Sequence, residues 1–524
     1  MQHYELLLPK FIDHAAKWHP HTEVVTGGGS ARARIGYAAL RDRALRLSGG
    51  FSAVGLNLGD RVATLAWNSQ AHMEIWYAAF GIGLVCHTLN PRISVAQLAD
   101  MIAQAGDRLL AVSPDQAGIV GELLPLCPSI EHVILLDEPG AATADFPSLA
   151  HIRVWSQDAF MAAGSADVRW GGFSETIDAG LCFTSGTTGA PKGVAYTHRS
   201  NYLHTLGVLQ ADVMGIGKRD AVLAAVPMFH ANGWGLPFAA PAVGAKFVLP
   251  GRHTDGASLA ALIVEEGVTL ALGVATVWLG LIDHLDRTGG TLPSLERVLL
   301  GGAPVPQALM DRIEDRLQVT VQTSWGMTEL SPLGTVTPAY APVRRSSQSG
   351  RPAIGVDLCV ADADGDPLPK QRGHEGRLLV KGGSVVERYF GHGAPATDAE
   401  GWFDTGDLAV IDEDGTLSIT GRSKDLIKSG GEWINPGEIE AIVGALPAVA
   451  LVAVIGRTHP KWGERPLLVI EPREGRSIGD EEISNALDGR IPRWWMPDAV
   501  VRLDRMPLAH TGKIDKQRLR LELG

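Results

Sequence analysis

The hydrophobic positions in the first third of the chain switch repeatedly between a helical period and a strand period. Apolar residues recur every three or four positions in some segments and form short continuous runs in others. This pattern predicts helices at 34–51, 69–83 and 94–106, separated by strands at 61–67, 84–90 and 108–113. Alternating helices and strands build parallel sheets covered by helices. We therefore expect an α/β fold with buried sheets, and the same alternation at 200–306 extends that expectation.

The pattern changes after Arg345, where short apolar runs are separated by turn dipeptides such as Asp-Gly. This spacing favours a β-rich subdomain. The elements expected beyond Lys424 are a helix from Pro436, strands at 449–456 and 465–472, a helix from 479 and a basic tail. Such a set is sufficient for a small α+β domain. We predict a large N-terminal domain at 1–423 and a small C-terminal domain at 424–524.

The amino-acid composition limits the classes of protein and of binding partner that the chain can have. Of the 524 residues, 45% are hydrophobic and 20% are charged, which excludes a disordered chain. The formal net charge of −12 argues against a nucleic-acid partner, because phosphate backbones require a basic surface. Any anionic ligand must therefore be bound by locally placed lysine and arginine side chains.

Cysteine spacing and hydropathy bear on location. Cys86, Cys127, Cys182 and Cys359 have no metal-ligand spacing, so we expect reduced thiols and a cytoplasmic protein. The first 20 residues are amphipathic with mixed charges, which indicates a surface helix rather than a secretory signal. The longest apolar run, 268–282, is shorter than the ~20 residues that cross a bilayer. We expect it to be buried, and we predict no integral membrane segment.

The stretch FTSGTTGAPKG, residues 183–193, concentrates glycines, hydroxyls and one lysine after an apolar strand. Glycines allow backbone N–H groups to approach an anion closely, and hydroxyls and Lys192 add donors and charge. A Walker A loop would continue into a helix, whereas the VAYTH that follows here is typical of a strand. We expect a hairpin-like loop, which alone fits either a phosphate site or an ordinary surface turn.

Further segments follow this loop in order: FHANGWG (229–235), GGAPVP (301–306), TSWGMTE (323–329), WFDTGDL (402–408), GRSKDLIKSGGEWINPGEIE (421–440) and PLAHTGKIDK (507–516). With them, nearly the whole chain resembles the adenylate-forming (ANL) superfamily of acyl-CoA synthetases, adenylation domains and luciferases. KDLIKSGGEWI and the Trp of FHANGWGLPFAA are most similar to medium- and long-chain fatty acyl-CoA synthetases and methylmercaptopropionate-CoA ligases. The resemblance implies that the protein uses Mg²⁺ as a cofactor and ATP and coenzyme A as co-substrates.

The resemblance assigns the ATP site residue by residue. The phosphates of ATP are bound by Thr184, Ser185, Gly186, Thr187, Thr188, Gly189 and Lys192, and the metal by Glu329 and Thr184. Adenine and the α-phosphate are bound by Gly302, Ala303, Pro304, Trp325, Gly326, Met327 and Thr328. Many relatives carry Tyr at the position of Trp325, a change that keeps ring stacking but loses a phenol contact.

The resemblance also assigns ribose, catalysis and coenzyme A. Asp407 binds the ribose hydroxyls, Arg422 contacts ribose and phosphate, and Lys513 bridges the substrate carboxylate and the α-phosphate. Lys424 is the hinge about which a mobile C-terminal domain rotates after adenylation. The rotation would bring the coenzyme A residues Ser429, Gly430, Gly431 and Glu432 to the site. From the residue alone, a capping carboxylate is an equal interpretation of Glu432.

The acyl group is expected near FHANGWG. We predict that His230 lies near the acyl carbonyl and that Trp234 bounds the acyl pocket beside Gly301, although both side chains would by default be core residues. The adjacent Trp494 and Trp495 belong to no motif and are interpreted as packing.

The favoured function is an AMP-forming acyl-CoA synthetase for a short- to medium-chain fatty acid or a methylmercaptopropionate-like acid. It activates the acid as acyl-AMP, releases pyrophosphate and transfers the acyl group to coenzyme A. An amino-acid adenylating enzyme is less favoured, because 229–235 contains no acid to pair with an ammonium group. A luciferase-like enzyme and a silent nucleotide sensor stay open. A homodimer is expected only by analogy with relatives.

Overall fold

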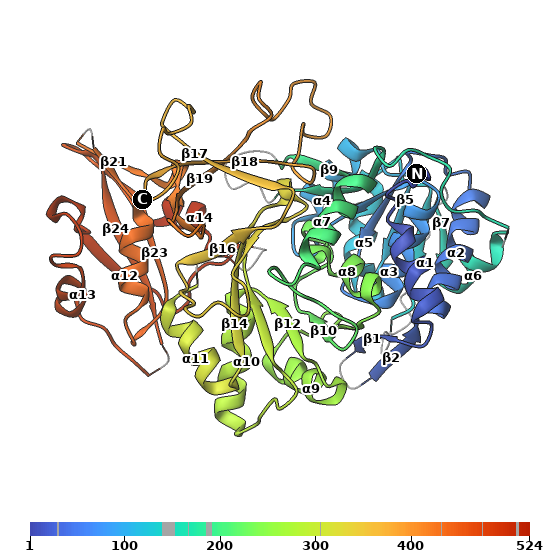
Figure 1. Ribbon diagram of the computed structural model, residues 1–524, viewed down its shortest axis with the longest axis horizontal. Coiled ribbons are helices and arrows are strands. Elements are labelled where there is room, and N and C mark those ends of the chain that lie inside the picture. The colour runs from blue at the N-terminus through green and yellow to red at the C-terminus, as the bar shows by residue number, and fades with distance from the viewer. Residues whose placement is uncertain are drawn as a thin grey trace.

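The computed structural model describes residues 1–28, 31–138, 152–165, 167–184, 191–303, 305–430, 432–473, 475–509 and 513–524. Its C-terminal part lies at the left of Figure 1 and its N-terminal sheet at the right, with a second large sheet between them. The predicted site residues that lie outside the described part of the chain are Ser185, Gly186, Thr187, Thr188, Gly189, Pro304 and Gly431.

The first sheet confirms the predicted alternation. Its strands, in spatial order, are β7 (Arg153–Ser156), β6 (His132–Leu135), β5 (Leu109–Val112), β3 (Arg61–Leu65), β4 (Val85–Thr88), β8 (Asp178–Phe183) and β9 (Gly193–Thr197). Its helices are α2 (Tyr37–Ala53), α3 (Gln70–Gly81), α4 (Val95–Ala105), α5 (Ala117–Leu123), α6 (Gln157–Ala163) and α7 (His198–Val208). The strands are parallel until β9, which returns antiparallel to β8.

The second sheet joins a parallel half to an antiparallel meander. The parallel half, with flanking strands, comprises β1 (Glu23–Gly28), β2 (Ala31–Gly36), β10 (Ala221–Ala224), β11 (Lys246–Leu249), β12 (Leu270–Gly273), β13 (Arg297–Leu300) and β14 (Thr320–Gly326). The meander comprises β15 (Leu333–Val336), β16 (Gln348–Pro352), β17 (Val356–Ala361), β18 (Glu375–Gly382), β19 (Phe403–Ile411) and β20 (Leu417–Arg422). Its helices are α8 (Leu236–Val243), α9 (Gly256–Glu266), α10 (Ala275–Thr288) and α11 (Gln307–Leu317).

The C-terminal part has its own sheet and core. Its strands are β21 (Ile427–Ser429), β22 (Glu432–Ile434), β23 (Val449–His459), β24 (Gly463–Pro472) and β25 (Ala499–Arg502). Its helices are α12 (Pro436–Gly444), α13 (Asp480–Leu487) and α14 (Lys516–Leu523). Buried Ile427, Ile439 and Leu468 belong to one cluster within this part. A separate core is what a domain that folds as a unit requires.

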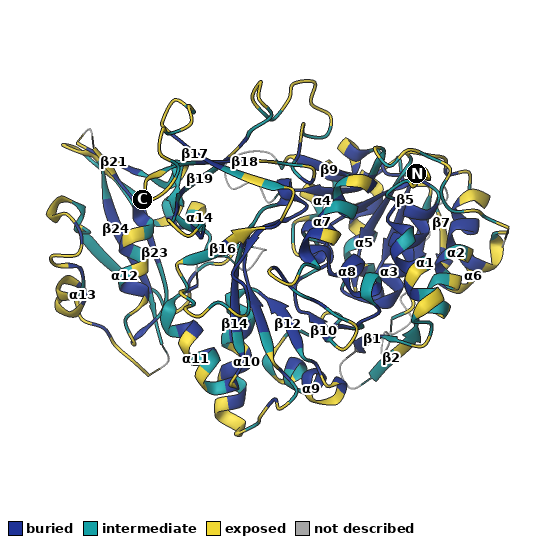
Figure 2. Ribbon diagram, in the orientation of Figure 1, coloured by how far each residue is buried: buried dark blue, intermediate teal, exposed yellow. Residues whose placement is uncertain are grey.

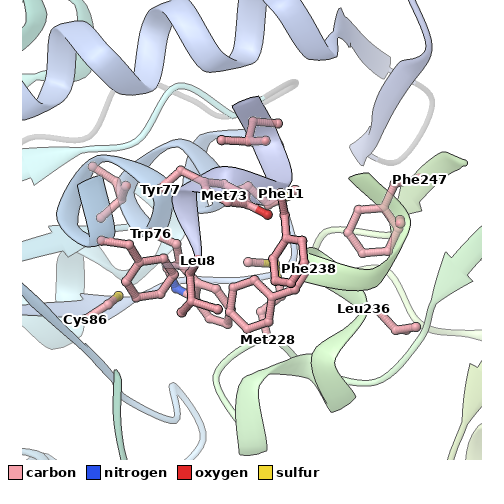
Figure 3. Close-up of a cluster of buried hydrophobic side chains, with 14 of the residues drawn as sticks. Leu8, Phe11, Met73, Trp76, Tyr77, Cys86, Met228, Leu236, Phe238 and Phe247 are labelled. Atoms are coloured by element: carbon pink, nitrogen blue, oxygen red, sulfur yellow. The ribbon is translucent and has the colours of Figure 1, made fainter. Parts of the chain in front are cut away.

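The two large sheets share a core around α8. Helix α1 (Pro9–Trp18) contributes Phe11, whose ring centroid lies 6.5 Å from that of Phe238. Helix α3 contributes Trp76, whose ring centroid lies 5.9 Å from that of Phe238. Figure 3 shows these side chains gathered around Phe238. The Tyr77 hydroxyl also donates to Pro237 O at 2.7 Å. The start of α8 is therefore fixed, and with it the end of the FHANGWG segment that precedes it. Figure 2 shows the central strands of the two large sheets mostly buried and the outer helix faces exposed.

The apolar run 268–282 is largely buried, as predicted, and is divided between β12 and α10. Two other sequence predictions about elements were wrong or incomplete. Residues 34–36 belong to β2 and not to a helix, because they pair with β1. The basic tail forms α14, where Asp515 caps the helix by accepting from Arg518 N at 3.0 Å and Leu519 is buried. A polar stretch with one buried leucine gives too weak a period for sequence reasoning to detect.

Candidate active site

The glycine-rich loop joins β8 to β9 as an antiparallel hairpin, as its sequence predicted. Phe183 pairs with Gly193, and the next pair closes the base of the loop. Thr184 N donates to Lys192 O at 2.9 Å, and Lys192 N donates to Thr184 Oγ1 at 3.2 Å. The Thr184 hydroxyl and the Lys192 ammonium are thus brought to the same end of the hairpin.

Glu329 lies beside this hairpin, in the turn Thr328–Leu330 that follows β14. Its side chain is buried, and its Oε1 accepts a hydrogen bond from the Tyr389 hydroxyl at 2.9 Å. The Tyr196 hydroxyl on β9 donates to Thr328 O at 2.9 Å, which ties the turn to the hairpin. The predicted metal and phosphate residues are therefore neighbours in space.

Asp407 forms the centre of the predicted ribose site. It is 1% exposed on β19, accepts from Trp325 Nε1 at 2.8 Å through Oδ2, and forms an ion pair with Arg422 Nε at 2.8 Å through Oδ1. Burial raises the pKa of Asp407, and Arg422 opposes that shift. Within the described part of the chain, Oδ1 accepts no hydrogen bond, so it retains acceptor capacity for a hydroxyl.

Trp325 and its neighbours close one side of this region. The indole is buried against the backbone of Gly334, where an added Cβ would lie 2.5 Å from the ring. Met327 packs against the same hydrophobic cluster, and Gly326 ends β14. The indole N–H therefore has a role that ring stacking alone did not predict, since it orients the Asp407 carboxylate.

Lys513 extends from the C-terminal part into the region of Asp407 and Gly302. A Cβ added to Gly302 would lie 3.8 Å from Lys513 Cε, and Ala303 follows Gly302 in the same turn. Burial and, to a smaller extent, the Arg422 charge lower the pKa of Lys513 to about 8, although Asp407 and Glu329 oppose the shift. The pKa of Lys424 is also lowered, first by burial and then by Arg422. The structure thus gathers Lys513, Lys424 and Arg422 around one carboxylate.

The FHANGWG segment forms a left-handed turn. The backbone φ is positive at every residue from 231 to 235, including 55° at Asn232 and 56° at Trp234. A non-glycine residue in this region costs about 1–3 kcal/mol, so the surrounding structure must hold it. Asn232 Nδ2 donates to Asn201 Oδ1 at 3.2 Å, and Met228 N donates to Asn68 Oδ1 at 2.7 Å. These contacts anchor the turn to the first sheet.

The turn brings Trp234 to the motif containing Gly301. The Trp234 ring is buried, and a Cβ added to Gly301 would lie 3.0 Å from it. Gly301 therefore permits the close approach of the ring. Burial and, to a smaller extent, the Lys513 charge lower the pKa of His230 to about 4, so the imidazole is neutral near pH 7. His230 and Trp234 are accordingly placed with Gly302 and Lys513.

The described coenzyme A residues, Ser429, Gly430 and Glu432, belong to a different structure, the strands β21 and β22 and the turn between them. Gly430, with φ of 61°, donates its N–H to Trp462 O at 2.8 Å. Arg465 Nη1 donates to the buried Ser429 Oγ at 3.3 Å, and Glu432 is exposed. These contacts lie within the C-terminal part, and Figure 1 shows β21 near the left edge of the molecule, away from β14.

Comparisons with known proteins decide the family. The model of the AMP-binding enzyme family matches residues 12–390, and the model of the AMP-binding enzyme C-terminal domain matches 438–513. The chain belongs to the AMP-binding enzyme family. The ANL resemblance predicted from the motifs is confirmed.

Relatives of known activity extend this result. The chain is 41% identical over 530 residues to the 3-methylmercaptopropionyl-CoA ligase of Ruegeria lacuscaerulensis, covering 99% of this chain and 97% of that one. It is 38% identical over 536 residues to the medium-chain-fatty-acid–CoA ligase of Ectopseudomonas oleovorans, covering 100% and 97%. The ATP-bound MatB of Rhodopseudomonas palustris superposes with a TM-score of 0.83 at 25% identity, covering 99% of both chains.

This AMP-binding enzyme is an AMP-forming acid–thiol ligase, an acyl-CoA synthetase that uses ATP, Mg²⁺ and coenzyme A. Its donor set fits Mg²⁺. The described residues contain no group of three or more His, Cys, Asp or Glu side chains arranged for a metal ion. Mg²⁺ requires no such cage, since it is usually bound by one or two protein ligands together with substrate phosphates and water. Glu329 and the Thr184 hydroxyl suit that arrangement.

Several residues that shape the site of this AMP-binding enzyme were missed by sequence reasoning. They are Asn68, Tyr196, Asn201 and Tyr389. Each is a single polar residue that contacts a motif distant in sequence, so no local spacing marks it. Asn68, three residues beyond the end of β3, gave the only available signal, a polar residue following a buried strand.

Among the described residues, no helix is long and apolar enough to cross a membrane.

Proposed function

We propose that this structure has the arrangement used for adenylation and that a rotation near Lys424 produces the arrangement used for thioester formation. The observation that carries this proposal is the position of Lys513. It comes from the C-terminal part, yet its charge interacts with Arg422, Asp407 and Glu329. A lysine so placed meets the reacting groups of the first half-reaction.

In this proposal the chain divides at 423/424, and the N-terminal domain binds ATP. The loop at 184–192 and Lys192 bind the β- and γ-phosphates, Thr328 contacts the α-phosphate, and Asp407 with Arg422 binds the ribose. Trp325 and the turn Gly301–Ala303 bound the adenine. Glu329 and Thr184 would hold Mg²⁺, which would offset charge on the polyphosphate. Support comes from the proximity of these groups in space.

Lys513 acts on the chemical step. A carboxylate oxygen of the acid forms a bond to the α-phosphorus while the bond to pyrophosphate breaks. Negative charge grows on the α-phosphate during this displacement, and a half-buried ammonium stabilises it more than an exposed one would. Neutral His230 carries one N–H, which suits a hydrogen bond to the acyl carbonyl oxygen.

After adenylation, rotation about Lys424 withdraws Lys513 and brings the hairpin β21–β22 to the acyl-adenylate. Ser429, Gly430 and Glu432 then face the pantetheine arm. The separation of β21 from β14 in Figure 1 supports the need for such a movement. Hinge residues near element ends commonly absorb the required dihedral change. Lys424 lies in a short turn between β20 and β21, which suits that role.

The acid is proposed to carry an apolar or thioether chain. The left-handed turn presents Trp234 and no carboxylate, so an ammonium group would be desolvated without a partner. The relatives named above act, by their names, on 3-methylmercaptopropionate and on medium-chain fatty acids. A short- to medium-chain fatty acid or a methylmercaptopropionate-like acid is therefore the proposed substrate.

The proposed setting is the cytoplasm, where the four cysteines, which are free and buried, would stay reduced. A homodimer stays a prediction by analogy. The absence of a nucleic-acid partner stays a prediction from the net charge of −12.

A panel of carboxylic acids tests the function. Pyrophosphate release is measured with ATP and Mg²⁺, with and without coenzyme A, for unbranched acids of increasing length, 3-methylmercaptopropionate and amino acids. The proposal expects turnover that requires coenzyme A and favours a neutral-tailed acid. Preference for an amino acid, or oxygen uptake in place of thioester formation, would contradict it.

A further inference from the structure

Tyr389 connects the two sides of the predicted triphosphate site. Its hydroxyl donates to Glu329 Oε1 at 2.9 Å, and its ring centroid lies 4.6 Å from Lys192 Nζ. One side chain therefore contacts both the predicted metal ligand and the predicted phosphate lysine. Tyr389 belongs to none of the sequence motifs described above.

The backbone around Tyr389 is fixed to the same two segments. Val386 N donates to Glu329 O at 2.8 Å, and Phe390 N donates to Gly193 O at 2.8 Å. A Cβ added to Gly193 would lie 3.0 Å from Phe390 Cβ, so the chain also packs closely there. The segment 386–390 thus spans from the Glu329 turn to the base of the phosphate hairpin. Its attachment at both ends gives the Tyr389 side chain a defined origin.

We propose that Tyr389 is a positioning residue for Mg·ATP, holding Glu329 by its hydroxyl and Lys192 by its ring. The proposal rests on the roles proposed for Glu329 and Lys192. A glutamate side chain has several rotatable bonds, and a hydrogen bond to Oε1 restricts them while Oε2 stays chemically able to bind a cation. An ammonium near a tyrosine face is attracted by the ring quadrupole.

The two contacts are separable by substitution. Tyr389→Phe removes the hydroxyl and keeps the ring, so it should affect Glu329 and spare Lys192. Tyr389→Leu removes both contacts. Losing an outer partner of a metal ligand typically costs about 10- to 100-fold in metal affinity or activity. Losing a partly exposed ring–ammonium contact costs about 2- to 5-fold.

The test is ATP binding to the full chain by calorimetry, without a carboxylic acid, so that no turnover occurs. Each variant is titrated with ATP twice, once in the presence of excess Mg²⁺ and once in the presence of EDTA. We expect Tyr389→Phe to weaken binding of ATP with Mg²⁺ by about tenfold and to leave binding in EDTA unchanged. Tyr389→Leu should weaken binding in EDTA as well, by about 2- to 5-fold.

Tyr340→Phe is the matched control. Tyr340 is exposed, and its hydroxyl pairs with the Asp212 carboxylate, so the same substitution removes the same kind of hydrogen bond outside the motif loops. It should bind ATP like the wild type under both conditions. Circular dichroism confirms that each variant is folded, and Tyr389→Phe decides the result if Tyr389→Leu is unstable.

Glu329→Gln distinguishes the possible failures. If it loses Mg²⁺-dependent binding and Tyr389→Phe does not, the role of Tyr389 is wrong and the proposed function stands. If Glu329→Gln also binds normally, the metal role of Glu329 is wrong and the Tyr389 proposal falls with it. Equal weakening of Tyr389→Phe with and without Mg²⁺ would likewise overturn the proposal, because it would indicate a general structural defect.

Discussion

The Asp407 region and the β21–β22 hairpin carry functional motifs of the same family, yet they are built differently. Asp407 is surrounded by residues from distant segments, with Trp325, Arg422 and Lys513 all acting on one carboxylate. The hairpin is held by Trp462 and Arg465, which lie in the same small part of the chain. This difference supports the proposal that one arrangement of the chain completes only the first of two chemical steps.

The largest effect is expected from substituting Lys513, which the C-terminal part contributes to the Asp407 region. Lys513→Ala should lower pyrophosphate release from acid and ATP by about 10²- to 10³-fold, the usual cost of losing a transition-state contact. The matched control is Lys516→Ala, which removes a nearby lysine that pairs with Glu440 at 2.7 Å. It should keep adenylation within a few-fold of the wild type. Equal losses in both variants would show that the defect lies in the fold of the C-terminal part.

The pH dependence sharpens the same contrast. Lys513 must be charged to act, and its pKa is lowered to about 8 in the ligand-free enzyme. Above that pH the charged fraction falls about tenfold per unit, so kcat/KM for adenylation should decline on the alkaline side. Lys513→Arg, whose guanidinium stays charged, should be slower but should lack this decline. An unchanged alkaline decline in Lys513→Arg would assign it to another group.

A smaller effect is expected at the acyl turn. Trp234→Ala should change the ratio of kcat/KM between longer and shorter acids by about tenfold, while the KM for ATP stays nearly constant. The reason is that the ring borders Gly301, where the acid is proposed to bind, whereas Asp407 and Arg422, proposed to bind the ribose, lie on other elements. Ratios unchanged across the series would exclude Trp234 from the acyl pocket.

Some parts of the molecule were predicted from the sequence more fully than others. The alternation of periods gave the α/β architecture, and the strand-like VAYTH correctly distinguished a hairpin from a Walker loop. Motif order was sufficient to group Glu329, Asp407 and Lys513, because relatives share that chemistry. The helix α14 was missed because its only buried residue is Leu519.

What the sequence did not show are contacts between segments far apart in the chain. Asn68 and Asn201 hold the strained turn from another sheet, and Tyr389 contacts a glutamate 60 positions away. A single polar residue has no periodicity, so its role appears only once the fold brings its partner close. The interpretation of Trp494 and Trp495 as packing is confirmed: Trp495 packs on the C-terminal core, and the partly exposed Trp494 lies edge-on against it with 5.8 Å between the ring centroids.

The central claim, that one small domain serves two half-reactions by rotating near Lys424, is tested most directly by single-turnover measurement of each half-reaction in Lys424→Pro and Lys513→Ala. Proline fixes φ and restricts the residue before it, which should block rotation and spare the arrangement seen here. We expect Lys424→Pro to form acyl-adenylate but no thioester, and Lys513→Ala to convert supplied acyl-adenylate and coenzyme A to thioester but to form no adenylate. Circular dichroism checks that both variants are folded. If both folded variants lose both half-reactions equally, the division of labour is wrong, and the C-terminal part is instead a lid needed throughout.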